Sequence, residues 1–443
     1  MKPPANPSET QQVEIGKPVY GGAFLARLEG KAVFVPLTLP GERARIRIAQ
    51  SKRGYAAAEA EEIVTLSAER IRPACAHFGA CGGCHYQHTD YASQLAFKQA
   101  ILRETLERGG VRDVGEIAVL AAEGEAQAWG YRNRIRLAFD AAGRPGYRGR
   151  RSHAVIPIEQ CPIAAPVLVE AAQAAAKAAR QSTPPLRLTE AALFANAEES
   201  ALLLSVFAAQ AGKTRFDEFA QRVKERIPAL AGAELMLAGS EAKRGMPPRT
   251  AARWGADSLT YRAAGFEYHV EQGAFFQVNR WLVDALVERV TGGHAGALAW
   301  DLFAGVGLFA RRLTDGFARV VAVESARAPV RSLAKNLKGT TGTPVRATAL
   351  EFLRRAREQA PPGSGTPDLI VADPPRTGLG GETCALLAEA GAPALTYVSC
   401  DPATLARDLR ALHEAGYRIH SVTLADLFPQ TFHLETVVQL RRS

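Results

Sequence analysis

The sequence lacks any apolar run that could cross a membrane, although the chain has 443 residues. Residues 1–12 are polar and contain prolines, so the sequence also lacks the apolar stretch of a signal peptide. Internal repeats are absent as well. We therefore expect a cytoplasmic protein with no membrane partner, and we expect it to act as a monomer. Its length predicts two or three domains.

Cysteine is scarce, with six residues in the whole chain. Four of them form a C-x5-C-x2-C motif (Cys75, Cys81 and Cys84) followed after 76 residues by Cys161. Four thiolates can hold a [4Fe–4S] cluster or a zinc ion. Zinc sites tend to pair two C-x2-C units and only one is present, so the pattern favours the cluster, with zinc as the alternative. Metal-ligating thiolates without a secretory signal are typical of a reducing cytoplasm.

A glycine loop follows the short apolar run at residues 298–303. Gly305 and Gly307 lie between this expected strand and a helix-like stretch at residues 308–313, an arrangement that lets a ligand approach the bare backbone. The next expected strand ends in Glu324, whose carboxylate can accept hydrogen bonds from a ribose diol. The loop has no third glycine, and Asp301 lies two residues before Phe303. These features favour S-adenosylmethionine over NAD as the cofactor.

Two further motifs follow expected buried strands. Asp373 begins an Asp-Pro-Pro-Arg turn whose prolines must take the chain out of the sheet. Amino-directed methyltransferases have an aromatic residue where Arg376 lies, which argues against N-methylation. Cys400 ends the strand at residues 394–399; a lone cysteine is usually buried filler, as expected for Cys384. At the carboxyl edge of a cofactor-binding sheet, however, a nucleophile is favoured.

The neighbour of this cysteine, Asp401, would disfavour the thiolate, and Arg376 is a candidate to offset it. Near the end of the chain, Glu435 precedes an apolar strand at residues 436–440. Without context it would be a surface carboxylate. Cys400, the glycine loop and the Asp-Pro-Pro turn together indicate a methyltransferase that activates a pyrimidine covalently.

The motifs resemble those of bacterial RNA (uracil-5-)-methyltransferases of the 23S ribosomal RNA type, which carry a TRAM domain and an iron–sulfur cluster. The similarity runs from about Val13 to Leu440. It implies 23S rRNA as the partner, Cys400 as the nucleophile that adds to uracil C6, and Glu435 as the base that removes the C5 proton. It also implies a cluster on the four cysteines and an S-adenosylmethionine pocket lined by Gln277, Phe303, Gly305, Leu308, Glu324, Ala349 and Asp373.

Two positions depart from that resemblance. Leu308 lies where family members often have asparagine, and Ala349 lies where an asparagine or aspartate commonly meets the adenine. Three alternatives stay open: a tRNA enzyme, which usually lacks the cluster and the barrel; a cytosine-C5 enzyme, whose nucleophile follows proline or threonine; and an RNA-binding assembly factor without turnover.

The domain organisation follows from composition and resemblance together. We expect a TRAM-like, RNA-binding β-barrel at residues 8–67 and a mixed α+β domain with the cysteine motif at residues 68–262. Part of residues 90–125 is expected to pack on the catalytic domain. Residues 263–443 should form a Rossmann-like α/β methyltransferase domain.

Charge points to a polyanionic partner, since the net charge is +9. Arg43, Arg45 and Arg47 alternate with apolar residues, which predicts a strand with one cationic face, either a solvated edge or a phosphate-binding surface. The basic segments Tyr131–Arg136 and Arg148–Arg151 are further candidates for RNA contact. Helices are expected near residues 93–109 and 171–180, and a hairpin from residues 192–196 and 202–207.

Overall fold

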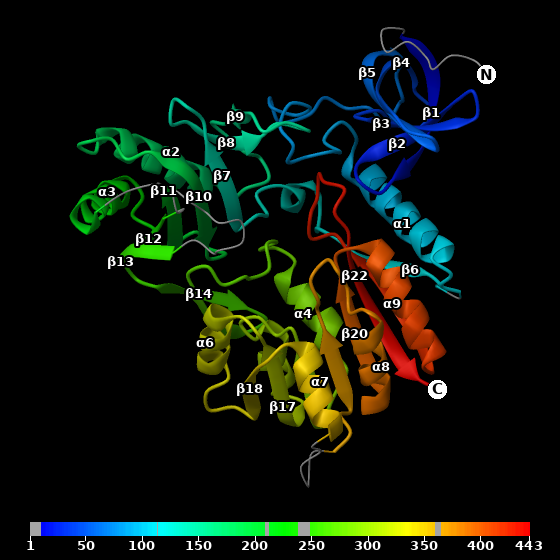
Figure 1. Ribbon diagram of the computed structural model, residues 1–443, viewed down its shortest axis with the longest axis vertical. Helices are drawn as coiled ribbons and strands as arrows, with labels where there is room; N and C mark the ends of the chain where they lie inside the picture. The colour runs from blue at the N-terminus through cyan, green and yellow to red at the C-terminus, as the bar shows by residue number, and fades with distance from the viewer. Residues whose placement is uncertain (1–9, 113, 209–211, 238–248, 359–364) are drawn as a thin grey trace.

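The computed structural model describes residues 10–112, 114–208, 212–237, 249–358 and 365–443. A small barrel, a central α+β region and a large α/β sheet with its helices follow one another along the chain (Figure 1). Among the described helices, none is long and apolar enough to span a membrane.

The barrel closes in the order β1-β2-β3-β5-β4. Its strands are β1 (Gln11–Val19), β2 (Ala23–Leu28), β3 (Lys31–Pro36), β4 (Arg43–Ser51) and β5 (Tyr55–Thr65). Ala44 and Ile46 of β4 are buried while Arg43, Arg45 and Arg47 are exposed, which confirms the alternation predicted from the sequence. The predicted barrel is therefore confirmed.

The central region is built on a seven-stranded sheet of order β13-β12-β11-β10-β7-β8-β9. The strands are β7 (Arg134–Phe139), β8 (Pro145–Arg148), β9 (Val155–Pro157), β10 (Leu188–Ala195), β11 (Leu202–Ala208), β12 (Leu230–Leu237) and β13 (Arg249–Gly255). Helices α2 (Pro166–Gln181) and α3 (Lys213–Arg226) pack against it with an alanine-rich core. The predicted hairpin is confirmed, because β10 and β11 pair antiparallel.

The large α/β sheet lies in the region that the sequence predicts to be catalytic, and we call it the catalytic sheet. It has eight strands in the order β18-β17-β16-β19-β20-β22-β21-β6. Their bounds are β6 (Ile117–Leu120), β16 (Gly296–Leu302), β17 (Phe317–Glu324), β18 (Gly342–Arg346), β19 (Leu369–Ala372), β20 (Ala394–Ser399), β21 (Tyr417–Ala425) and β22 (Glu435–Arg442). The neighbouring helices are α4 (Val283–Thr291), α5 (Leu308–Leu313), α6 (Arg327–Asn336), α7 (Ala349–Glu358), α8 (Gly381–Ala390) and α9 (Pro402–Glu414). Strands β14 (Ser258–Ala263) and β15 (Phe266–Glu271) form a separate hairpin.

Both faces of the catalytic sheet are covered. Along β19, Leu369 and Val371 belong to one apolar core and Ile370 and Ala372 to another, so the strand is buried throughout. That burial explains why the central strands read as continuous apolar runs rather than alternating ones. Only β22 runs antiparallel to its neighbours in this sheet.

One edge of the catalytic sheet comes from far away in the sequence. Strand β6 pairs parallel with β21, and helix α1 (Tyr91–Arg108) packs on α9 (Figure 1). The chain between the barrel and the central sheet, which also holds the short 3-10 helix η1 (Glu125–Ala128), thus lies against the catalytic fold.

Candidate active site and cysteine pocket

The candidate catalytic residues meet at one edge of the sheet. Asp373 follows β19 and Cys400 follows β20, so both lie at the carboxyl ends of neighbouring parallel strands. Glu435 begins β22, whose Thr436 pairs with Ser399 of β20. Continuing this antiparallel pairing by one residue places Cys400 opposite Glu435. Tertiary pairing therefore brings the proposed nucleophile and base together.

Burial and charge act in opposite directions on the Cys400 thiol. Burial, followed by the negative charge of Glu435, raises its pKa to about 11, and Asp373 contributes in the same direction. The guanidinium of Arg376 lowers this pKa. In the free protein the group is therefore mostly a neutral thiol at neutral pH, and Arg376 is the cation that favours its ionised form.

Glu435 and Asp373 form a pair of carboxyl groups that disfavour each other's ionisation. Burial, and then the charge of Asp373, raises the pKa of Glu435 well above its usual range, while Arg376 opposes the shift. Burial also raises the pKa of Asp373 to about 7. A carboxyl group with a raised pKa is a stronger proton acceptor than one in water, which suits a general base.

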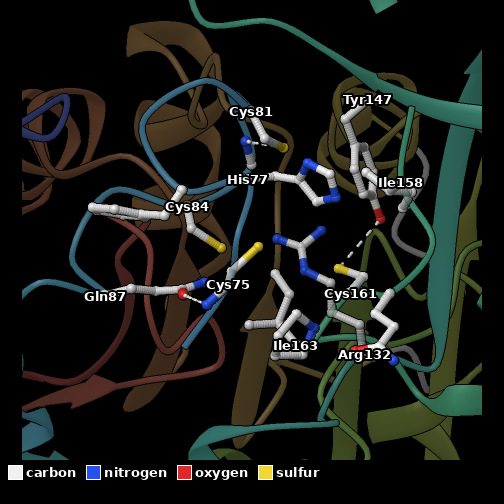
Figure 2. Close-up of a pocket in the computed structure, with 14 residues that line it drawn as sticks. Cys75, His77, Cys81, Cys84, Gln87, Arg132, Tyr147, Ile158, Cys161 and Ile163 are labelled. Atoms are coloured by element: carbon white, nitrogen blue, oxygen red, sulfur yellow. Dashed lines mark hydrogen bonds between the residues drawn. The ribbon is translucent and has the colours of Figure 1, made fainter. Parts of the chain in front are cut away.

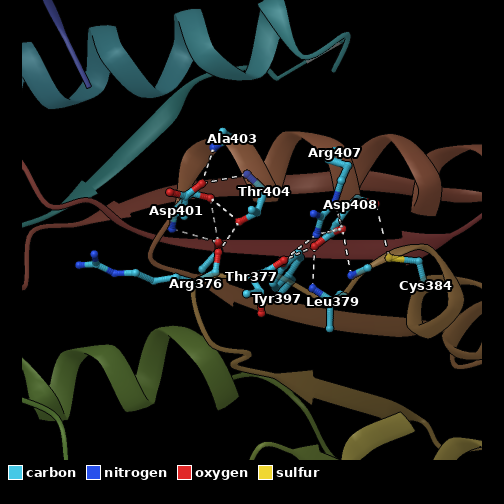
Figure 3. A network of polar contacts seen from close by, with 12 residues as sticks. Arg376, Thr377, Leu379, Cys384, Tyr397, Asp401, Ala403, Thr404, Arg407 and Asp408 are labelled. Atoms are coloured by element: carbon cyan, nitrogen blue, oxygen red, sulfur yellow. Dashed lines mark hydrogen bonds and ion pairs between the residues drawn. The ribbon is translucent and has the colours of Figure 1, made fainter. Parts of the chain in front are cut away.

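Asp401 has a different role from the one its sequence position suggests. Its carboxylate caps α9 by accepting hydrogen bonds from the backbone N–H groups of Ala403 and Thr404, both at 3.0 Å (Figure 3). The carboxylates that principally oppose the Cys400 thiolate are instead Glu435 and Asp373. Sequence proximity identified the wrong acid, because the pairing of β20 with β22 sets which charges face the thiol.

The Asp-Pro-Pro-Arg turn is held against α9 by a buried acid that sequence reasoning missed. Asp408 accepts hydrogen bonds from the backbone N–H of Leu379 at 2.7 Å and from the hydroxyl of Tyr397 at 2.8 Å (Figure 3). The Thr404 hydroxyl donates to the carbonyl of Arg376 at 3.2 Å. These bonds fix the backbone of the segment that carries Asp373 and Arg376.

The glycine loop has the conformation that its sequence predicts. Gly305 has φ +57° and Gly307 has φ +92°, and a Cβ at Gly307 would lie 2.7 Å from Leu333. Apart from its neighbours in the chain, no described residue has an atom within 4 Å of a Cβ built on Gly305, so the backbone is open to a ligand there. Glu324 holds this loop, since it accepts from the N–H of Gly305 at 3.1 Å and from the N–H of Ala326 at 2.6 Å.

Asp301 lies beneath the loop and is fully buried. One carboxylate oxygen accepts a hydrogen bond from the N–H of Ala310 at 2.8 Å, and the other has no hydrogen-bond partner among the residues that the structure describes. Burial raises its pKa to about 8. Phe303, next along the loop, has φ +68°, a left-handed conformation that non-glycine residues rarely adopt.

The remaining candidate cofactor residues lie around this loop in different settings. Leu308, the first residue of α5, is buried in the apolar core, and its carbonyl accepts from the Tyr268 hydroxyl at 3.1 Å. Ala349, at the start of α7, is buried in the core on the other face. Gln277 is buried in the segment between β15 and α4, where its backbone carbonyl accepts a hydrogen bond from the side-chain amide of Asn133 at 2.8 Å.

The four cysteines line a single pocket, although Cys161 is distant from the others in sequence (Figure 2). Gln87 accepts a hydrogen bond from the N–H of Cys75 at 3.0 Å. Burial raises the pKa of Cys81 and Cys161, and that of Cys84 to about 12, while the positive charge of Arg132 opposes all three shifts. The other lining residues include His77, Tyr147 and Ile163.

The described side chains contain no group of three or more His, Cys, Asp or Glu residues close enough to hold one metal ion. In Figure 2 the sulfurs lie around the pocket rather than converging on one point, with the guanidinium of Arg132 among them. The possible metal donors that line the pocket are the four cysteine thiols and the imidazole of His77.

The structure corrects one predicted RNA contact and gives acidic partners to another. Tyr131 is fully buried and Arg132 lines the cysteine pocket, so the start of the Tyr131–Arg136 segment faces the interior. On the barrel, Arg45 pairs with Glu62 at 2.5 Å and Arg47 with Glu61 at 2.8 Å. Strand β5 therefore largely neutralises the cationic face of β4.

The second basic segment is exposed but also paired. Arg148 and Arg151 are exposed, and Arg150 is half-buried. Glu59 of the barrel binds Arg150 at 2.5 Å and Arg151 at 2.9 Å. This contact joins the barrel to the central region.

Known proteins match this chain over nearly its whole length. A family model described as TRAM domain matches residues 4–60, and one described as tRNA (uracil-5-)-methyltransferase matches residues 252–443. The 23S rRNA (uracil(1939)-C(5))-methyltransferase RlmD of Chromohalobacter salexigens is 34% identical and covers 97% of this chain and 89% of its own length. The RlmD of Azoarcus sp. is 32% identical, covering 96% of this chain and 98% of its own length.

A solved structure shares the architecture. The tRNA (uracil-54, C5)-methyltransferase of Pyrococcus abyssi, in complex with S-adenosyl-L-homocysteine, superposes with a TM-score of 0.75. It covers 97% of this chain and 99% of its own, at 22% identity. This likeness establishes the fold of the chain.

Proposed function

Because the chain belongs to the RNA (uracil-5-)-methyltransferase family, we propose that it transfers a methyl group to C5 of a specific uridine in 23S ribosomal RNA. The observation that carries the proposal is the placement of Cys400 opposite Glu435, beside Asp373 and Arg376, at the carboxyl edge of the sheet. The RlmD relatives named above favour the ribosomal substrate.

The arrangement accounts for the two demands of methylation at C5. Uracil C5 is a poor nucleophile, so Cys400 must lose its proton and add through sulfur to C6, which makes C5 enolate-like. S-adenosylmethionine supplies an electrophilic methyl group, which C5 then takes. Glu435 removes the C5 proton, the electron pair re-forms the C5–C6 double bond, and the C6–S bond breaks to free Cys400.

Asp373 contributes selectivity in this proposal. As a carboxylate it would accept a hydrogen bond from uracil N3–H, which cytosine lacks. The target uridine must leave its stack to reach the edge of the sheet, which is easiest in a single-stranded loop. Glu324 and the open backbone of Gly305 would hold the nucleoside part of the cofactor.

The cysteine pocket suits a [4Fe–4S] cluster bound by Cys75, Cys81, Cys84 and Cys161. Four cysteines line one pocket, and the sequence has one C-x2-C unit rather than the two that zinc sites tend to pair, which favours a cluster over zinc. Arg132 supplies positive charge beside the thiolates. The cluster would hold protein segments together rather than take part in methyl transfer.

The tests separate the steps. Cys400→Ala should abolish methylation of protein-free 23S rRNA while RNA affinity stays nearly unchanged, because phosphate contacts dominate binding. In the Glu435→Gln variant, Cys400 should still add to C6 and the methyl group should still be transferred, but the C5 proton should stay. A methylated covalent complex should therefore accumulate and be visible on denaturing gels. Appreciable turnover by Cys400→Ala would exclude the mechanism.

The substrate and the metal are tested separately. The family model is named for tRNA enzymes, so tRNA is the alternative substrate. Methylation of tRNA with none on 23S rRNA would establish that alternative. Anaerobically purified protein should be brown and contain iron, whereas stoichiometric zinc without iron would overturn the cluster assignment.

A further inference from the structure

The loop that leads into Glu435 is tied to the rest of the protein at nearly every residue. It comprises residues 426–434 and joins β21 to β22, and we call it the base loop. The ammonium of Lys98 binds Asp426 at 2.5 Å and donates to the carbonyl of Phe428 at 2.9 Å. The Tyr131 hydroxyl donates to the carbonyl of Pro429 at 3.0 Å.

The centre of the base loop is bound directly to the segment that carries the cysteines. The carbonyl of Gln430 accepts hydrogen bonds from the backbone N–H groups of His85 at 2.8 Å and Tyr86 at 3.1 Å. These two residues immediately follow Cys84. The ring of Phe432 packs edge-on against that of His85, with centroids 4.6 Å apart. The cysteine pocket and the base loop therefore share a rigid boundary.

Gln430 itself has a conformation that needs support. Its φ is +68°, in the left-handed region, which costs about 1–2 kcal/mol for a residue other than glycine. Gln94 compensates, because its side-chain oxygen accepts from the N–H of Gln430 and its amide donates to the Gln430 side chain, both at 2.9 Å. Both side chains are buried. A strained backbone held by this many bonds indicates that the loop geometry is maintained for a purpose.

The far side of the base loop reaches the reacting groups. The ring of His433 lies 3.3 Å from the guanidinium of Arg376, and Phe432 packs against Tyr20 of the barrel. The Tyr20 hydroxyl donates to the carbonyl of Cys400 at 3.4 Å. A shift of the loop would thus move Arg376 and Glu435 together.

We propose that the left-handed backbone conformation at position 430, rather than the glutamine side chain, positions the catalytic base, and that the segment Cys84-His85-Tyr86 holds this backbone in place. The inference rests on the proposed function. An intact cysteine pocket keeps the base loop, and with it Glu435, aligned for removal of the C5 proton. The pocket affects catalysis by fixing backbone, since none of its cysteines needs to touch the substrate.

The test compares two substitutions of one residue. Gln430→Gly allows φ +68° without strain and keeps the backbone bonds, so proton removal should stay within about threefold of wild type. Gln430→Val disfavours that φ, and a small displacement of a catalytic group can slow a step about 10- to 100-fold. The Val variant should therefore accumulate the methylated covalent complex with 23S rRNA, with lower kcat and unchanged KM.

Controls separate positioning from loss of folding. Ala264→Val imposes the same strain at φ +49° in the β14–β15 turn and should accumulate no complex. If Gln430→Val does not fold, Gln94→Ala should give the same accumulation because it leaves the Gln430 N–H unpaired. If Gln430→Val or Gln94→Ala releases the methylated RNA as fast as Gln430→Gly does, the inference is wrong. If the wild-type enzyme never forms 5-methyluridine, the proposed function is wrong instead.

Hydrogen exchange tests the link to the cysteines without using activity. Cys84→Ser should speed amide exchange in residues 428–434 at least about tenfold, since the bonds from His85 and Tyr86 lose their anchor. Cys384→Ser, at a buried cysteine of α8, is the matched control and should leave this exchange unchanged. Equal exchange in the two variants would overturn the coupling.

Discussion

Arg376 should control how readily Cys400 ionises. The pKa of Cys400 is raised to about 11, so at pH 8 about one molecule in a thousand carries the thiolate. A raised thiol pKa means that the thiolate fraction grows with pH, about tenfold for each unit below pH 11. Arg376→Met removes the charge that lowers this pKa. Because Arg376 is exposed and partly screened by solvent, we expect only about a 3- to 10-fold loss of thiolate at pH 8.

The assay is alkylation of the free enzyme by iodoacetamide between pH 7 and pH 10, with the peptide that contains Cys400 followed by mass spectrometry. The wild-type rate should rise about tenfold per pH unit, Arg376→Met should be slower at every pH, and Arg376→Lys should be intermediate. Arg354→Met removes an exposed arginine of α7 that pairs with Glu382 and should leave the rate unchanged. A rate that is flat between pH 7 and pH 9, or equal in Arg376→Met and wild type, would refute the reasoning.

Three further predictions concern stability and RNA binding. Lys98→Met leaves Asp426 buried without its cation and should lower the free energy of unfolding in urea by about 3–5 kcal/mol. The double variant Lys98→Met/Asp426→Leu should recover most of this loss. A single variant as stable as wild type would contradict the prediction. The pKa of Asp301 is raised by burial to about 8, so its contribution to stability is complete below about pH 4 and is lost as pH rises toward 8. As the pH rises from 4 to 8, the free energy of unfolding of Asp301→Asn should therefore increase relative to that of wild type, by at most about 1.4 kcal/mol per pH unit. Thermal unfolding measures this difference, and parallel pH profiles of the two proteins would refute the assignment. Glu59→Gln frees the two arginines that it binds, so RNA binding should tighten and its salt dependence should steepen by about one phosphate contact; weaker binding would show that the ion pairs serve only to dock the barrel.

Several strands and helices of the catalytic sheet could be predicted from the local sequence pattern. The apolar runs at residues 298–303 and 394–399 match β16 and β20, because strands covered on both faces must be apolar throughout. The helix predicted at residues 308–313 coincides with α5, because a glycine turn directly after a strand is typical of a strand–turn–helix unit. These signals depend on a few neighbouring residues, so they survive without knowledge of the fold.

The sequence did not predict which distant segments of the chain contact one another. The basic segment that begins at Tyr131 was expected to contact RNA, yet Tyr131 is buried and supports the base loop. The arginines of β4 form the exposed face that the sequence predicts, but the sequence did not show that glutamates of β5 pair with two of them. A one-dimensional pattern shows that a residue is charged but not which acid the fold will bring beside it.

The sequence alone predicts the order of the motifs, a small β-barrel, the buried strands and the chemistry that four cysteines and a thiol at a sheet edge can support. Only the tertiary structure decided that β6 would complete the catalytic sheet, that Glu435 rather than Asp401 would face Cys400, and that residues following Cys84 would grip the base loop. The division has a physical reason. Periodicity and turn chemistry are set by adjacent residues, whereas ion pairs, pKa shifts and loop geometry depend on which surfaces meet when the whole chain packs.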